Sequence, residues 1–326
     1  MAGLWIPGAP VIGNVNQDGD RGNVDLSDID LTVETLTDKR VRYGRLGTQQ
    51  FIGANGYLQS APENTWPLEY LNGTPVGRSE PGPQSTNLIP YATGFTKWRQ
   101  DKAAVTANAG IALDGTNTAQ LITTLERTSG EPIVYITPRI EPGDYTLTIV
   151  VRAGSTNFVH AALRDSANTN STRVFANLTT LETSVLQVAG SITAAASAIT
   201  LGDWVLLTAH FKTALPAGSY FLYFGPSGGI NVGAATGDSI YATFAQFEKL
   251  IVGTSLITTT GVAATRAAAF ASVRVWPWLT GIRLHYSNNT VDSILLNGSE
   301  GDWYQLPFST RDWATRKIRR ISYYKE

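Results

Sequence analysis

Short runs in which apolar and polar residues alternate fill residues 87–268, and they constrain the fold more than any other feature. The runs are rich in Thr, Val, Tyr and Phe and are separated by Gly, Pro, Asn and Asp. Within residues 145–151 the alternation places one set of side chains on a buried face. About eight such runs at a spacing of roughly ten residues predict two packed β-sheets. A parallel α/β sheet is disfavoured because almost no helical pattern separates the runs.

The composition narrows the classes of partner. Lys and Arg number 25 against 26 Asp and Glu, so nothing in the overall charge favours nucleic acid or an anionic membrane. Cysteine is absent, which excludes disulfides, thiolate metal sites and a cysteine nucleophile. The first residues lack the pattern of a signal peptide, and no apolar run approaches the length of a membrane span. We therefore expect synthesis in the cytoplasm without signal-directed export or membrane insertion.

Two segments precede the sandwich. Residues 1–53 read as an extended arm with two or three strands, although residues 24–36 also fit a short helix capped by Ser27 or Asp28. Residues 54–86 carry five prolines, which forbid a central strand or a helix interior. Asn72-Gly73 predicts a two-residue hairpin turn within that segment. Its large apolar side chains favour a linker that packs against the sandwich over a solvated tether.

Residues 269–326 form a separate pattern of short strands and hold four of the eight tryptophans. A unit of under about 60 residues cannot build a strong core alone. The segment must therefore dock on the sandwich, pair with other copies, or present its aromatic side chains to a ligand. Trp276, Trp278 and Trp303 are candidates for the last role.

Several spaced motifs resemble one group of viral proteins. They are the hairpin LNGTPVGR, the opening NLIPYATGFTKW, the turn at Asp114-Gly115-Thr116, residues 141–154, 201–211 and 241–250, and the closing TTTGVAATRAA. Together they resemble bacteriophage tail-fibre and virion proteins that carry a carbohydrate-binding-module-like, concanavalin-like jelly roll. The resemblance covers about residues 55–268. The sequence departs from the family pattern just before Thr86, where RSEPGPQS replaces the acidic and aliphatic segment that usually precedes the sandwich.

This resemblance implies an all-β chain with a jelly-roll β-sandwich over residues 87–268. The sandwich is flanked by an extended N-terminal anchor and a small Trp-rich C-terminal β-unit. It implies that residues 1–53 attach to other virion proteins, that the protein is a homo-oligomer, commonly a trimer, and that it resides in the virion. A structural calcium is frequent in such sandwiches, and Asp238 and Glu248 are candidates for one carboxylate ligand each. No other cofactor is expected.

In such jelly rolls sugars lie across a sheet face or at loop tips, with aromatic rings stacked on the sugar rings. The strand at residues 220–224 carries aromatic rings on both faces. Phe221 and Tyr223 therefore face outward or toward a neighbouring subunit, and they are the leading candidates for glycan binding. His160, Arg164 and Asp165 adjoin a polar loop that is long enough to touch a ligand, with a solvated turn as the alternative.

Enzyme chemistry finds little support. The three histidines, His160, His210 and His285, do not stand at metal-ligand spacing, and HExxH, GxSxG and phosphate-loop motifs are absent. We therefore expect a phage tail fibre or receptor-binding protein that recognises a bacterial surface polysaccharide. The alternative is a purely structural baseplate or capsid-decoration protein. A glycan depolymerase is third, since Asp292 with Glu300 or Asp302 offers a carboxylate pair by sequence proximity alone.

Overall fold

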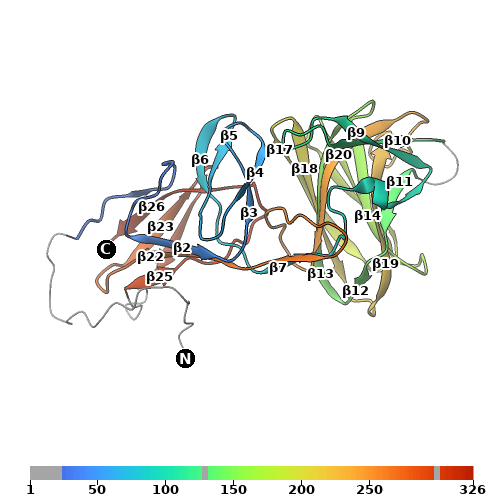
Figure 1. The fold of residues 1–326 in the computed structure, drawn as a ribbon. Coiled ribbons are helices and arrows are strands. Elements are labelled where there is room, and N and C mark those ends of the chain that lie inside the picture. The colour runs from blue at the N-terminus through green and yellow to red at the C-terminus, as the bar shows by residue number, and fades with distance from the viewer. Residues whose placement is uncertain (1–23, 127–130, 297–301, 326) are drawn as a thin grey trace.

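The computed structural model describes residues 24–126, 131–296 and 302–325. The chain forms two β-rich lobes that lie side by side (Figure 1). The described residues contain one short 3₁₀ turn, η1 (Phe95–Lys97), and are otherwise strands and loops. The prediction of an all-β protein with a β-sandwich is thus confirmed.

The larger lobe is the sandwich, made of two antiparallel sheets. The six-stranded sheet has the order β17 (Thr193–Leu201), β18 (Trp204–Thr213), β13 (Gly143–Ala153), β20 (Ser239–Glu248), β10 (Ala119–Thr124) and β9 (Ala103–Gly110). The seven-stranded sheet has the order β16 (Thr183–Ala189), β15 (Ser171–Asn177), β14 (Phe158–Asp165), β19 (Gly218–Ser227), β11 (Ile133–Ile136) and β8 (Arg99–Asp101), and β12 (Arg139–Ile140) also pairs with β19.

The strand order is that of a jelly roll. When the strands β10, β11, β13, β14, β15, β18, β19 and β20 are counted 1 to 8 along the chain, the sheets read 1-8-3-6 and 2-7-4-5. Successive strands thus cross between the sheets as two Greek keys require. The pairs β8 and β9, and β16 and β17, extend the two opposite edges.

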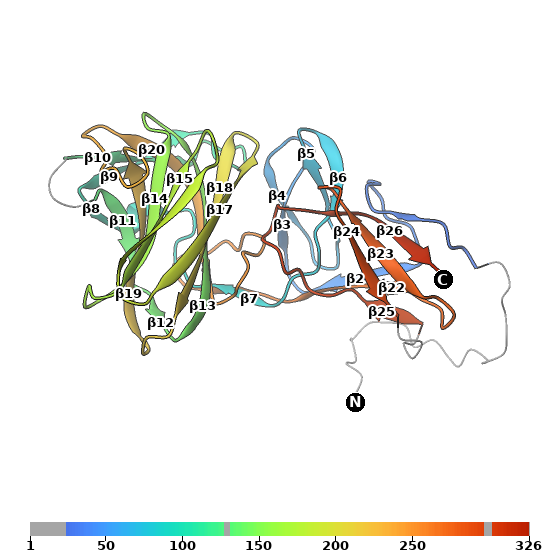
Figure 2. The ribbon, with the colours of Figure 1, turned by 180° about the vertical axis from the view of Figure 1, so that it is seen from behind.

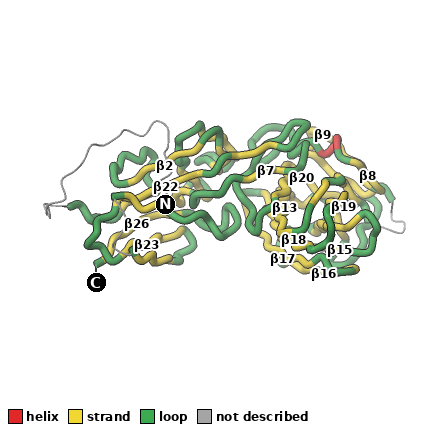
Figure 3. The backbone as a smooth tube through the Cα atoms, turned by 90° about the horizontal axis from the view of Figure 1, so that it is seen from below, coloured by secondary structure: helices red, strands yellow, loops and turns green. Residues whose placement is uncertain are grey.

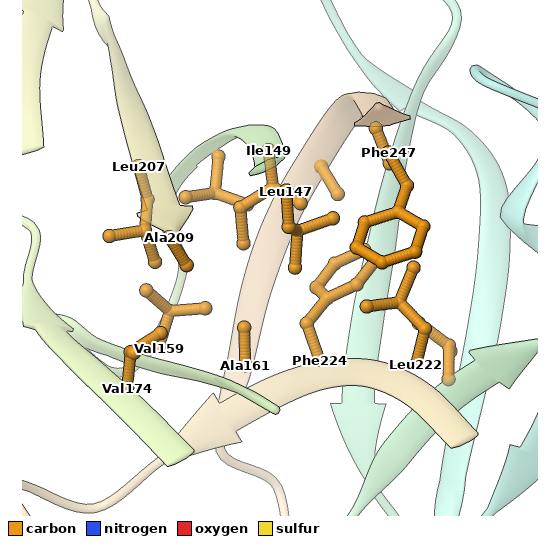
Figure 4. Close-up of a cluster of buried hydrophobic side chains, with 14 of the residues drawn as sticks. Leu147, Ile149, Val159, Ala161, Val174, Leu207, Ala209, Leu222, Phe224 and Phe247 are labelled. Carbon is orange, nitrogen blue, oxygen red and sulfur yellow. The ribbon is translucent and has the colours of Figure 1, made fainter. Parts of the chain in front are cut away.

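The core between the sheets follows from the alternation along each strand. On β13, Leu147 and Ile149 point inward and pack with Phe224 of β19 and Phe247 of β20 (Figure 4). Trp98 is also buried in this core. Since every second residue of the inner strands joins the same cluster, the outer faces of both sheets are left to make other contacts.

The second lobe is assembled from both ends of the chain. Its main sheet has the order β24 (Val291–Leu295), β23 (Gly281–Tyr286), β26 (Ile318–Tyr324), β6 (Thr74–Arg78) and β5 (Leu68–Leu71), and β1 (Ile29–Asp30) also pairs with β26. A smaller sheet joins β2 (Val41–Arg45), β22 (Ala269–Arg274) and β25 (Trp303–Gln305), and β3 (Gln49–Ile52) forms a hairpin with β4 (Leu58–Ala61).

Residues 24–86, 269–296 and 302–325 therefore share one lobe, so position 53 does not separate two folded units, whereas the chain enters the sandwich at about position 86. Ile29 pairs with Ile321, and Val41 pairs with Val273. Long-range pairing gives the C-terminal segment the core it cannot build alone. Residues 24–36 contain the two-residue strand β1 and no helix. Of the arm predicted for residues 1–53, residues 1–23 lie outside the described residues.

Two antiparallel crossings connect the lobes. β7 (Ser85–Asn87) enters the sandwich and β21 (Ala264–Arg266) leaves it, and the two strands pair with each other. Figures 2 and 3 show this ribbon running from one lobe to the other. Farther inside, the amide of Ala92 donates to the hydroxyl of Thr259 at 2.8 Å. The opening and closing motifs of the sequence thus meet and close the sandwich at the junction.

Candidate functional site

The two sheets of the sandwich differ in what covers their outer faces. On the six-stranded sheet, outward side chains such as Val150 and Phe244 form a buried cluster with Ile52 and Trp313 of the second lobe. The seven-stranded sheet lies on the far side of the sandwich from that lobe, as Figures 1 and 2 agree. Its outer face is turned away from the second lobe. Phe175, His160 and Tyr223 are buried on this face, whereas Tyr135, Arg164 and Phe221 remain partly exposed.

The strand register gathers residues from three strands on this face. Arg164 of β14 stands opposite Phe221 of β19. Tyr223 stands opposite Ala162 of β14 on one side and Tyr135 of β11 on the other. The alternation predicted for residues 220–224 is confirmed, because Tyr220, Leu222 and Phe224 belong to the core between the sheets. We call Tyr135, Arg164, Phe221 and Tyr223 the aromatic face.

A guanidinium lies over the rings of this surface. The Cζ atom of Arg164 is 4.6 Å from the ring centroid of Phe221 and 5.9 Å from that of Tyr223. The rings of Tyr135 and Phe221 are 5.6 Å apart. The side chains of Phe221 and Tyr135 are half-buried, whereas Tyr223 is only 3% exposed. The surface thus offers two partly exposed rings beside a buried third one, together with a guanidinium cation.

A buried polar group supports the face from one side. Nη1 of Arg173 contacts Oε1 of Glu131 at 2.6 Å, and Nε2 of His160 lies 3.4 Å from Oε2 of the same carboxylate. Burial lowers the pKa of His160, against the opposing effect of Glu131. Because His160 is only 1% exposed, it cannot touch a ligand at the surface. It packs against Tyr223, with ring centroids 6.1 Å apart, and so helps to position that ring.

A groove of about 400 Å³ continues the aromatic face toward the edge of the sheet. Tyr135 lines both surfaces, and Lys97 and Arg99 add positive charge to the groove. A chain of sugar rings stacked on Tyr135 could therefore extend into a channel that carries hydrogen-bond donors.

Asp165 lies near the aromatic face but is committed to its own loop. Its Oδ1 accepts from the amides of Thr169 and Asn170, at 2.8 Å and 3.1 Å. Its Oδ2 accepts from the side chains of the same two residues. Asp165 therefore shapes the turn after β14, and we leave it out of the proposed contact surface.

The tryptophan candidates of the C-terminal segment lie on the second lobe, apart from the aromatic face. Trp276 and Trp278 stack with centroids 6.1 Å apart, and both pack against the core of that lobe. The guanidinium of Arg42 covers Trp303 at 3.7 Å. The structure thus brings Phe221, Tyr223, His160 and Arg164 together, and it separates them from these three tryptophans.

The two calcium candidates stand at opposite ends of one strand. Asp238 precedes β20, and its Oδ2 accepts the amide of Ala235 at 2.6 Å. Glu248 ends the same ten-residue strand, about 30 Å away by strand geometry. Its carboxylate is fully buried and accepts hydrogen bonds from Ser85, Gln246 and Thr254. Within the described residues, no three acidic or histidine side chains group in a way that could hold a metal ion.

Tyr135, Glu131 and Arg173 were not singled out from the sequence. Tyr135 sits in the run IVYI, whose four apolar residues show no alternation that would mark it as the outward residue. Its place beside Tyr223 follows from the pairing of β11 with β19, which sequence periodicity does not reveal.

Comparison with known proteins adds little to this geometry. No protein-family model matches the chain, and no curated protein matches it. Among solved structures, the chain is similar to the adhesin domain of Epf from Streptococcus pyogenes at 6% sequence identity, over 72% of this chain and 81% of that one. The TM-score is 0.18, which is too low to support an inference about function. The described part of the chain has no helix long and apolar enough to span a membrane.

Proposed function

We propose that this chain is a bacteriophage virion protein, a tail fibre or receptor-binding protein, that binds a bacterial surface glycan on its aromatic face. Glycan binding is proposed because Tyr135, Phe221 and Arg164 cluster on the sheet face that the second lobe does not cover. The phage part is supported by the sequence motifs that resemble virion proteins.

The chemistry of the aromatic face suits a carbohydrate. Half-buried rings can stack on the apolar faces of pyranose rings, and a guanidinium can donate to hydroxyl or carboxylate oxygens beside them. The rings of Tyr135 and Phe221 stand at an interplanar angle of 44°, so they present two surfaces to successive sugars. Such a site binds weakly by itself, and several copies on one virion would raise the overall affinity.

The proposal is tested by binding to a panel of bacterial surface polysaccharides, first on an array and then by calorimetry. Phe221→Ala should weaken binding about tenfold, because a lost aromatic contact is worth roughly 1 kcal/mol. Phe308→Ala is the matched control, since Phe308 is an exposed phenylalanine on the second lobe. Both variants should melt within a few degrees of the parent, because surface substitutions change the free energy of unfolding only slightly.

Two results would contradict the aromatic face as the site. If Phe221→Ala binds as the parent does while Trp278→Ala loses binding, the glycan site lies on the second lobe. If the protein binds no polysaccharide yet still incorporates into particles, the receptor-binding function is excluded.

A purely structural role in the virion is the second candidate, and one feature favours it. Among the described strands, β24 pairs with β23 alone, and its Val291 and Leu295 are exposed. A free strand edge with apolar side chains is suited to pairing with another subunit. The glycan depolymerase finds less support, because Asp292 is held by Arg316 at 2.8 Å and Glu300 lies outside the described residues.

A further inference from the structure

A small polar cavity of about 40 Å³ lies at the junction of the two lobes. Its walls include Arg45 of β2 and Lys317 beside β26 from the second lobe, and Ser255 from the loop that follows β20 of the sandwich. Arg266, the last residue of the crossing strand β21, also lines it. A volume of this size admits only a small group, such as a few water molecules or one small anion.

Among the residues that line this cavity, cations outnumber carboxylates. Two carboxylates, Glu80 and Asp312, face five cations, which are Arg45, Arg266, Arg311, Arg316 and Lys317. Both carboxylates are already engaged, Glu80 with Arg316 at 2.8 Å and Asp312 with His210 at 3.0 Å. Lys317 has its own partner in Glu69, also at 2.8 Å.

Three guanidinium groups remain, and within the described part of the chain none of them forms an ion pair. They are those of Arg45, Arg266 and Arg311. Nη1 of Arg266 donates to the carbonyl of Ser255 at 2.9 Å. Burial lowers the pKa of Arg266; Glu248 opposes that effect, and the charge of Arg45 adds to it. Arg316 also pairs with Asp292 at 2.8 Å, so nearby carboxylates offset much of the charge. What distinguishes the site is that three of its guanidinium groups lack an ion-pair partner among the described residues.

Arg45 is the least satisfied of these groups. It is only 3% exposed, and its Nη1 donates to the carbonyl of Thr48. Its Nε and Nη2 are buried and have no hydrogen-bond partner among the described residues. A buried cation with two unused donors is costly, and a planar guanidinium matches two oxygens of an oxyanion at once.

We propose that this cavity binds a small tetrahedral oxyanion, such as sulfate or phosphate, through Arg45 together with Arg266 and Arg311. These donors come from the second lobe and from the crossing strand, and Ser255 of the sandwich forms part of the same wall, so the bound anion lies at the junction of the lobes. This site is independent of the aromatic face on the far side of the sandwich.

The test is calorimetric titration of the full chain with inorganic phosphate, and separately with sulfate, in chloride buffer at constant ionic strength. One anion should bind per chain with a saturable isotherm. Arg45→Gln should weaken binding by about tenfold or more, the ratio that corresponds to one lost charge-assisted hydrogen bond. Arg139→Gln is the matched control, because Arg139 is exposed on β12 of the sandwich and does not line the cavity.

Absence of saturable binding by the parent overturns the proposal, and so does an equal affinity in the parent and Arg45→Gln. Should Arg45→Gln fail to fold, Arg311→Gln replaces it, since Arg311 is exposed and its substitution should leave the fold intact. Weaker binding in Arg311→Gln with unchanged affinity in Arg139→Gln then supports the site. Equal affinity in these two variants overturns it.

Discussion

Asn87 ties the first crossing strand to the sandwich, and its removal should be among the most costly single changes in the protein. Its side chain is fully buried. Oδ1 accepts from the amides of Ile89 and Phe247, at 3.1 Å and 3.0 Å. Nδ2 donates to the carbonyls of Ala245 and Ile257, at 3.3 Å and 2.9 Å. One amide thus satisfies four backbone groups that no strand pairing reaches.

The expected loss of stability follows from these four hydrogen bonds. Asn87→Ala leaves two buried N–H groups without an acceptor, and each such group costs about 1–3 kcal/mol. The two abandoned carbonyls add less, because a carbonyl oxygen has a second lone pair to use. We therefore expect the free energy of unfolding to fall by about 4 kcal/mol. The slope of the urea dependence should stay the same, since the surface exposed on unfolding does not change.

The assay is urea unfolding followed by tryptophan fluorescence, with Asn288→Ala as the matched control. Asn288 sits in an exposed turn and bonds only within that turn, where its Oδ1 accepts the amide of Thr290 at 3.2 Å. Its substitution should cost about 0.5 kcal/mol or less. If Asn87→Ala proved no more costly than Asn288→Ala, the inventory of buried hydrogen bonds at the junction would be wrong.

Two further predictions concern the support beneath the aromatic face. Burial lowers the pKa of His160 below its ordinary value of 6.5, so the unfolded chain binds more protons and the free energy of unfolding should fall as pH drops below about 6.5. His160→Gln should flatten that slope in urea titrations at several pH values, and an unchanged slope would contradict the assignment. A Cβ at Gly225 would overlap the carbonyl oxygen of Pro132, so Gly225→Ala should cost about 1–3 kcal/mol. Gly233→Ala, with open space at its Cβ, should cost almost nothing, and equal melting temperatures would refute the clash.

Much of the sandwich follows from local pattern. The alternation in β13 sets which side chains face the core, and Tyr145, Leu147 and Ile149 lie there. The hairpin between β5 and β6 also follows, because Asn72 and Gly73 both adopt positive φ, as a two-residue turn of this kind requires. In each case a few neighbouring residues determine the outcome.

The second lobe could not be predicted in the same way. β1 pairs with β26 across almost the whole chain, and β6 meets β26 through Arg78 and Ile318. Period-two alternation says which face of a strand is apolar, but it contains no information on which distant strand lies beside it. Segments that read as an arm, a linker and a tail are therefore one lobe because each supplies strands that the others lack.

For the aromatic face too, the sequence of a strand determines which side chains point outward, and the neighbouring strands determine how exposed those side chains are. Alternation alone assigns Phe221 and Tyr223 to the outer face of β19, and the structure agrees. Their accessibility differs because the neighbours differ: Tyr223 stands between β11 and β14, while Phe221 contacts the guanidinium of Arg164 and the ring of Tyr135 and stays partly exposed. In the proposed site Phe221 is therefore the better candidate for ligand contact, and the buried Tyr223 supports it from beneath.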